Sequence, residues 1–185
     1  MNLKELELSQ CKYIRRFSAD DNVPMLELMH DGEVNQFFRF NGNEKTIDDV
    51  TNYIKEANES KDSLHLAMQN EGGKYIGSIS LKNIDHTHNT AEYAIMCAKQ
   101  YHGKGYAYKA TKELLSLAFG PLQLHSVFLD VYSENTRAIR FYEKIGFVYE
   151  GEFKECLFIR GQYRSLKWYR ILENTTKDMK ESYKW

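Results

Sequence analysis

The sequence predicts an α/β or α+β fold in which helices cover both faces of a mostly antiparallel sheet. Two observations support this prediction. The expected elements follow the order strand, helices, three strands, helix, strand, helix and two strands. The 185 residues contain no internal repeat and no linker rich in Pro, Gly or Ser, which indicates one continuous domain over 1–185. We expect its core to cover about 11–172 and the remaining residues, 173–185, to form a polar tail.

The first half of the chain supplies four of the expected strands and the early helices. The sequence pattern predicts strands at about 11–17, 64–69, 74–82 and 90–98. Asn70-Glu71-Gly72-Gly73 is a strong turn signal, so the second and third of these strands form a hairpin. Two or three short helices are expected between about 20 and 60, the clearest of them at 46–57.

The second half contains the clearest helix of the chain, at about 105–119. Its apolar stripe, at three- and four-residue steps, consists of Ala107, Ala110, Thr111, Leu114, Leu115 and Ala118. Gly120-Pro121 ends this helix, and an alternating strand follows at about 125–131. A second helix is expected at about 135–145, with Gly146 placed to cap it. Two last strands, at about 147–156 and 163–172, are joined near Arg160-Gly161.

Composition argues against several classes of protein. The formal net charge of -1 predicts neither nucleic-acid binding nor attraction to an anionic membrane. No apolar run approaches the roughly 18 residues that a membrane-spanning helix needs. Three cysteines without CxxC spacing, Cys11, Cys97 and Cys156, argue against a zinc ribbon or a disulfide framework and favour the reducing cytoplasm. His86-x-His88 lies in a polar loop, and we assign no metal site.

The segment from Gln100 to Ala107 has the pattern Gln-x-x-Gly-x-Gly-x-Ala and opens the helix at 105–119. The first N–H groups of a helix have no partner inside the helix, and the helix dipole adds positive charge there. Glycines allow a phosphate to approach the backbone closely. The segment therefore predicts an anion site, although a glycine-rich helix start without a ligand is nearly as plausible from these residues alone. The P-loop and dinucleotide patterns both fail here, because Gly105 follows Lys104 and Tyr108 stands where the latter needs glycine.

A second segment, Asn135 to Phe147, lies about thirty residues later and carries Asn135, Ala138, Tyr142 and Gly146-Phe147. With both segments in this order, the chain resembles the GNAT superfamily of acetyl-CoA-dependent N-acetyltransferases over roughly 11–172. The resemblance implies a GNAT-like acyl-CoA N-acyltransferase fold, with a sheet splayed in the middle. It also implies acetyl-CoA as cosubstrate.

In that family the pantetheine arm lies between two splayed strands, which correspond here to about 95–98 and 125–131. The resemblance implies that backbone groups of Ile95, Met96 and Cys97 pair with the arm, and that N–H groups from Tyr101 to Tyr106 hold the pyrophosphate. The positions assigned to the cofactor are Ile95, Met96, Cys97, Gln100, Tyr101, His102, Gly103, Lys104, Gly105, Tyr106, Ala107, Asn135, Arg137, Ala138 and Tyr142.

Two residues are the catalytic candidates. Tyr142 occupies the family's general-acid position, where a phenol can give a proton to the departing thiolate, or it only packs on the apolar stripe of its helix. Glu92 resembles a strand acid that some members use as a base through ordered water, or it is a solvated carboxylate. Asn135 holds the cofactor or caps the helix. Cys97 is interpreted as a wall of the pantetheine channel rather than a nucleophile.

The acceptor is expected to be a primary amine: a protein N-terminus, a polyamine, an amino sugar or an antibiotic amine. Between 20 and 59, ten acidic residues stand against three basic ones, which either attract a cationic amine or face water. The layout resembles the branch of ribosomal-protein, spermidine and small-amine acetyltransferases, although Arg164-Ser165 replaces the Asp that many members carry after Tyr163. The alternative is a non-catalytic acyl-CoA-binding or regulatory domain of the same fold. A homodimer is left open.

Overall fold

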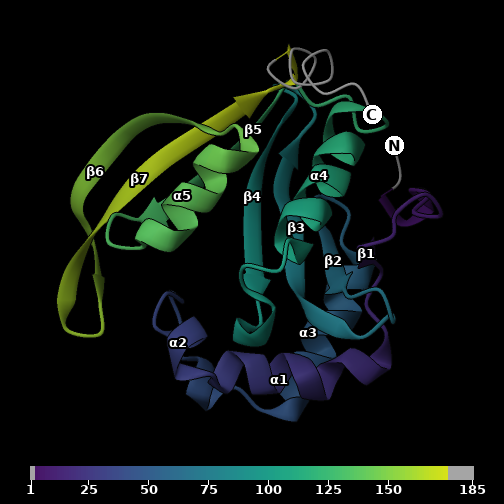
Figure 1. Cartoon of the computed structure of the whole chain (residues 1–185), viewed down its shortest axis with the longest axis horizontal. Helices are drawn as coiled ribbons and strands as arrows, with labels where there is room; N and C mark the ends of the chain where they lie inside the picture. Colours follow the sequence, from purple (N-terminus) through teal and green to yellow (C-terminus); the bar gives the residue numbers. More distant parts are fainter. Residues whose placement is uncertain (1–2, 175–185) are drawn as a thin grey trace.

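A computed structural model describes residues 3–174, which fold around one seven-stranded sheet (Figure 1). The strand order is β1-β2-β3-β4-β5-β7-β6. The strands are β1 (Ile14–Arg15), β2 (Leu64–Gln69), β3 (Tyr75–Asp85), β4 (Thr90–Cys97), β5 (Ser126–Tyr132), β6 (Val148–Ile159) and β7 (Gln162–Leu172). Of the predicted polar tail, 175–185 lie outside the described residues.

Helices cover both faces of the sheet, as the sequence predicts. The α-helices are α1 (Asn22–His30), α2 (Gly32–Asn35), α3 (Ile47–Glu59), α4 (Tyr106–Phe119) and α5 (Thr136–Ile145). Buried side chains of α4 and α5, such as Leu114 and Ile139, join the core cluster on one face. Met25 of α1 and Ile54 of α3 belong to a second cluster on the other face. Among residues 3–174, no helix is both long enough and apolar enough to span a membrane.

The sheet splays between β4 and β5, and this confirms the predicted gap. Every other neighbouring pair of strands is antiparallel. β4 and β5 are parallel, and they pair only from Thr90 to Glu92 with Ser126 to Phe128. Beyond Glu92, β4 stays paired with β3 as far as Cys97. One edge of β4 is therefore unpaired along the second half of the strand (Figure 1).

The first strand is shorter than the sequence predicts, and a helix carboxylate explains why. β1 contains two residues, where a strand over about 11–17 was expected. The backbone N–H groups of Lys12, Tyr13 and Ile14 donate to the Glu113 carboxylate on α4, at 2.8, 2.8 and 3.1 Å. Because a side chain from the following half of the molecule satisfies these donors, the backbone here does not need a longer strand ladder.

The β6–β7 hairpin extends away from the sheet and curves toward the side of the molecule that carries α2 (Figure 1). β6 runs to Ile159, past the predicted end near 156, and its register with β7 shifts between Phe153 and Leu157. Arg160, in the turn of the hairpin, donates to the backbone oxygens of Asn35 and Phe40 at 3.1 Å each. These bonds attach the hairpin tip to the segment that follows α2.

Candidate active site

The predicted anion site lies at the start of α4, on a loop with two left-handed glycines. Gly103 and Gly105 have φ values of +72° and +84°, and an added Cβ at either would point into open space. The requirement for glycine there is therefore the backbone conformation and not crowding. Gly105 is the N-cap of α4, which begins at Tyr106.

The amides of this loop divide into two groups. Those of Tyr101, His102 and Lys104 donate to Ala98, Lys99 and Tyr101 within the short 3₁₀ turn. Between Tyr101 and Tyr108, the amides that have no acceptor among residues 3–174 are those of Gly103, Gly105, Tyr106, Ala107 and Tyr108. The anion site therefore begins later than the predicted span, which starts at Tyr101, and it extends two residues further into α4, from Tyr106 to Tyr108.

The splayed edge of β4 is the second predicted cofactor surface. The Ala98 amide donates to Ile76 of β3, so by alternation Met96 also directs its backbone groups toward β3. Ile95 and Cys97 then direct theirs into the gap. The expectation that the Met96 backbone pairs with a bound arm is wrong for this reason, although its side chain lines the cavity on the opposite face of the sheet.

His102 links the two sides of the gap. Its Nε2 lies 2.9 Å from the Cys97 carbonyl oxygen, and its Nδ1 lies 2.8 Å from Nη1 of Arg137 on α5. Because arginine only donates, Nδ1 must accept and Nε2 must carry the proton. Arg137 is thereby held at the mouth of the site. Asn135 caps α5 by accepting from the Ala138 amide at 3.2 Å, which confirms the capping alternative, and it also lines the cavity.

Three of the predicted cofactor positions lie away from the cavity wall. Gln100 is exposed, and the Lys104 ammonium lies 5.8 Å from the centre of the Tyr101 ring. The Tyr106 ring packs edge to face with Tyr13 and Tyr101. Tyr106 can still contribute its backbone amide. The other predicted positions line one cavity of about 1080 Å³. They are Ile95, Met96, Cys97, Tyr101, His102, Gly103, Gly105, Ala107, Asn135, Arg137, Ala138 and Tyr142.

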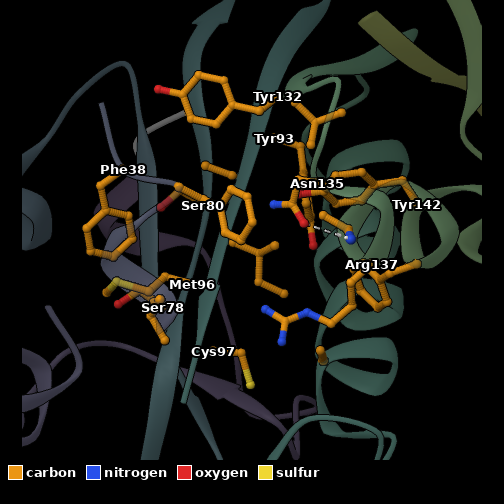
Figure 2. A pocket seen from close by; sticks show the side chains of 18 of the residues that line it. Phe38, Ser78, Ser80, Tyr93, Met96, Cys97, Tyr132, Asn135, Arg137 and Tyr142 are labelled. Carbon is orange, nitrogen blue, oxygen red and sulfur yellow. Dashed lines mark hydrogen bonds between the residues drawn. The ribbon is translucent and has the colours of Figure 1, made fainter. Parts of the chain in front are cut away.

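Tyr142 projects from α5 into that cavity (Figure 2). Its ring packs edge to face with Tyr93 and Phe147, and 8% of the residue is exposed. Burial raises the pKa of the phenol above its ordinary value, so the hydroxyl is protonated at neutral pH. No residue among 3–174 forms a hydrogen bond with this hydroxyl, which leaves its proton available to a bound group.

Glu92 lies where β4 leaves β5 and also lines the cavity. Its carboxylate pairs with the Lys82 ammonium at 2.5 Å and accepts from the Asn83 amide at 3.3 Å. Glu92 is therefore held in an ion pair and is not the solvated carboxylate that the sequence left as an alternative.

Cys97 lines the cavity, and nothing around it resembles a nucleophile's partner. Burial raises the pKa of its thiol to about 11. Its sulfur lies 3.7 Å from the Ala98 carbonyl oxygen, and His102 contacts its backbone and not its thiol. A protonated thiol is a poor nucleophile.

The far half of the cavity is aromatic and comes from residues that sequence reasoning missed. Figure 2 shows Phe38, Ser78, Ser80 and Met96 on one side of the cavity, facing Tyr142, Asn135 and Arg137 on the other. His65 of β2 bonds Ser80 at 2.8 Å. Ser78, Ser80 and Lys82 alternate along β3, which is the one sequence signal that they share a face. Nothing in the sequence places Phe38 or Tyr132 beside them.

The acidic wall that the sequence made conceivable does not form. Of the ten acidic residues between 20 and 59, Asp49 alone is among the described residues that line the cavity. The other nine lie outside the cavity lining, and they do not all face water as the alternative held, because Asp21 is buried in an ion pair with Arg15. Residues 3–174 also contain no group of three or more His, Cys, Asp or Glu side chains arranged to hold a metal ion.

Comparison with known proteins agrees with this geometry. The family model described as an acetyltransferase (GNAT) domain matches residues 13–148. Spermidine N(1)-acetyltransferase of Escherichia coli (strain K12) is 41% identical over 93 residues, which cover 50% of each chain. A candidate ribosomal N-acetyltransferase of Bacillus subtilis (strain 168) is 35% identical over 103 residues, 55% of each chain. The chain thus spans about half the length of the curated relatives it matches.

Solved structures extend the likeness across most of the fold. Spermidine N-acetyltransferase from Vibrio cholerae, in complex with CoA and spermine, has a TM-score of 0.80 and 26% identity. The alignment covers 88% of this chain and 95% of that one. The splayed strands β4 and β5, the glycine-rich start of α4 and the α5 segment all lie within residues 13–148, which the family model matches. The chain belongs to the GNAT family of acetyltransferase domains.

Proposed function

We propose that the protein is an N-acetyltransferase that moves the acetyl group of acetyl-CoA directly to a primary amine. One observation supports this proposal most strongly. A single cavity begins at the unpaired amides of α4, passes the splayed edge of β4 and Tyr142, and ends in an aromatic half. An elongated cofactor and a second substrate can therefore meet inside it, beside a protonated phenol.

The residues present fit the cofactor. The unpaired amides at the start of α4 suit a diphosphate, and Arg137, Arg140 and Lys144 of α5 add positive charge along the same wall. The gap-facing backbone groups of Ile95 and Cys97 suit an extended amide chain, because they offer it the hydrogen bonds of an additional strand. When bound, acetyl-CoA supplies the thioester that is attacked.

Two side chains of the protein, Tyr142 and Glu92, then transfer the protons of the reaction. Tyr142 holds a proton at its hydroxyl and gives it to the departing sulfur. The amine must be neutral when it attacks, and Glu92 is the acid nearest the point where the strands part. We propose that Glu92 receives the amine's proton through water. Its carboxylate is held by Lys82 and Asn83, which favours a water relay over direct contact with the amine.

The relatives support an amine acceptor. Two are named spermidine acetyltransferases, and the Vibrio cholerae structure contains spermine beside CoA. For this chain we propose that the acceptor is a small amine and that the reaction takes place in the reducing cytoplasm. A homodimer stays a prediction. The apolar side chains exposed on the β6–β7 hairpin, with Val148, Phe153, Phe158 and Tyr163 each 60% or more exposed, are the surface that such a dimer would cover.

Calorimetry tests the cofactor half of the proposal. Acetyl-CoA should bind one to one, and Gly105→Ala should weaken it about tenfold, because a Cβ forces the strained φ of +84° to change. Gly151→Ala is the matched control, since an added Cβ there also meets open space but needs no left-handed backbone. Equal affinities in all three proteins would contradict the assignment. Tight binding with no thiol released across a broad amine panel would favour the non-catalytic alternative.

A further inference from the structure

In the acceptor half of the cavity, the two less exposed carboxylates, Glu92 and Asp130, are already paired with cations of the protein. This half is formed by the segment after α2, by α3 and by the sheet face carrying Ser78, Ser80 and Tyr132. Three carboxylates line the cavity within the described chain: Asp49, Glu92 and Asp130. Each of them is engaged by another group of the protein, and each engagement is structurally distinct.

Asp130, on β5, is bound by Arg39 from the segment after α2, and the side chain of Asp130 is 10% exposed. Glu92 is bound by Lys82 at 2.5 Å. Asp49 accepts from the backbone N–H and the hydroxyl of Thr46 at 2.8 and 2.9 Å, which caps α3. A second ammonium entering this space would find Glu92 and Asp130 already paired with cations, whereas the exposed Asp49 uses only its Oδ2 oxygen for Thr46.

The cavity's charge leads to the same conclusion. Three cations, Arg39, Lys45 and Lys82, line the acceptor half together with the three carboxylates, so its formal charge is zero. The cations of α5 lie on the cofactor side. A binding site for a polyamine gains affinity from uncompensated negative charge at each ammonium, and this site supplies none.

The remaining lining is aromatic and neutral. Phe37, Phe38 and Phe40 come from one short segment, and Phe38 stacks on Phe40 at 4.9 Å. His65 hydrogen-bonds Ser80, and its pKa is lowered first by burial and next by the nearby Lys82 charge, so it is neutral at pH 7. The buried Tyr132 hydroxyl has no hydrogen-bond partner within residues 3–174, and Figure 2 shows its ring at one end of the cavity. Such a surface suits rings, methylenes and hydroxyl groups.

We propose that the acceptor is a small amine that carries one positive charge on an uncharged body, and that Arg39 excludes polyamines by neutralising Asp130. This inference rests on the proposed function. It distinguishes the chain from its spermidine-acetylating relatives at the same site, because specificity is obtained here by occupying a carboxylate that a second ammonium would otherwise bind.

Three amines with the same five-carbon chain test the proposal: 1-aminopentane, 5-aminopentan-1-ol and 1,5-diaminopentane. The wild-type protein should acetylate both monoamines with a kcat/KM about tenfold or more above that of the diamine, since a second ammonium must enter without a counter-charge. The two monoamines distinguish an apolar body from a hydroxylated one. A preference for the diamine, or for spermidine, over both monoamines would overturn the proposal.

Variants of the Arg39–Asp130 pair identify the residue responsible. Arg39→Gln frees the Asp130 carboxylate and should shift the kcat/KM ratio toward the diamine about fivefold. The double variant Arg39→Gln/Asp130→Asn removes the freed charge and should restore the wild-type ratio. Lys61→Gln, on the exposed turn after α3, removes an equal charge away from the cavity and should leave the ratio unchanged.

These outcomes distinguish a failure of the proposed role of Arg39 from a failure of the proposed function. An Arg39→Gln ratio equal to that of the wild type would overturn the role of Arg39, and a shift that persists in the double variant would do the same. The wild-type ratio needs no variant, so the substrate class is tested even if a variant fails to fold. If no amine of the panel is acetylated although acetyl-CoA binds, the proposed function itself fails, and the inference fails with it.

Discussion

At the scale of single residues, the proposed reaction depends on the phenol of Tyr142. Tyr142→Phe keeps the ring that packs on Tyr93 and Phe147 and removes only the hydroxyl. We expect kcat to fall about 100-fold, because general-acid catalysis is lost, while the affinity for acetyl-CoA stays within about twofold. Steady-state kinetics with a fixed amine measure both. Tyr149→Phe, on the exposed part of β6, is the control.

The pH dependence of the same reaction gives a second view of Tyr142. Because burial raises the pKa of this phenol above its ordinary value near 10, it remains protonated as the pH rises through the neutral and moderately basic range. Activity should therefore not decline between about pH 7 and pH 9.5. A basic limb near pH 8 that disappears in Tyr142→Phe would show that the phenol titrates in the wrong range for this role.

His65 makes stability depend on pH. Its pKa is lowered, chiefly by burial, so below about pH 6.5 the unfolded chain binds more protons than the folded one. The free energy of unfolding should consequently fall as the pH drops from 7 to 5. His65→Gln should reduce that dependence, which urea denaturation at the two pH values would reveal; an unchanged slope would contradict the buried neutral imidazole.

At the scale of elements, Glu113 attaches the start of the chain to α4. Glu113→Gln leaves one acceptor oxygen for three backbone donors, at Lys12, Tyr13 and Ile14. We expect a loss of about 2–3 kcal/mol in the free energy of unfolding, measured by urea denaturation, because the partly buried amides of Tyr13 and Ile14 lose their charged acceptor. Glu59→Gln on the exposed end of α3 should change it by less than about 0.5 kcal/mol. Equal effects of the two variants would mean that the anchor contributes little.

This anchor also shows where sequence reasoning fails for an element. The apolar periods of α4 and α5 are local, and both helices form close to where they are predicted. The length of β1 depends on a carboxylate one hundred residues away, as the separation between Tyr13 and Glu113 shows. No local pattern reports such a partner, so the predicted strand over 11–17 was too long.

At the scale of the whole molecule, the two halves of the cavity differ in how far the sequence foretells them. The cofactor half comes from two continuous segments, whose glycines and helix starts are visible in the sequence. The acceptor half is assembled from separate segments: Arg39 and Asp130 lie 91 residues apart, and Arg160 and Asn35 lie 125 apart. Only the folded sheet brings them together, and so the acidic run between 20 and 59 suggested a wall that does not exist.

The most direct test of the account is the acetylated product itself. The protein is supplied with acetyl-CoA labelled with ¹³C in the acetyl group and with an equimolar mixture of amines, and free thiol and labelled N-acetyl products are counted together, the latter by mass spectrometry. The account predicts one labelled N-acetyl amine per thiol over many turnovers, with monoamines dominating the product. Saturable binding of acetyl-CoA with no labelled amine formed would contradict it.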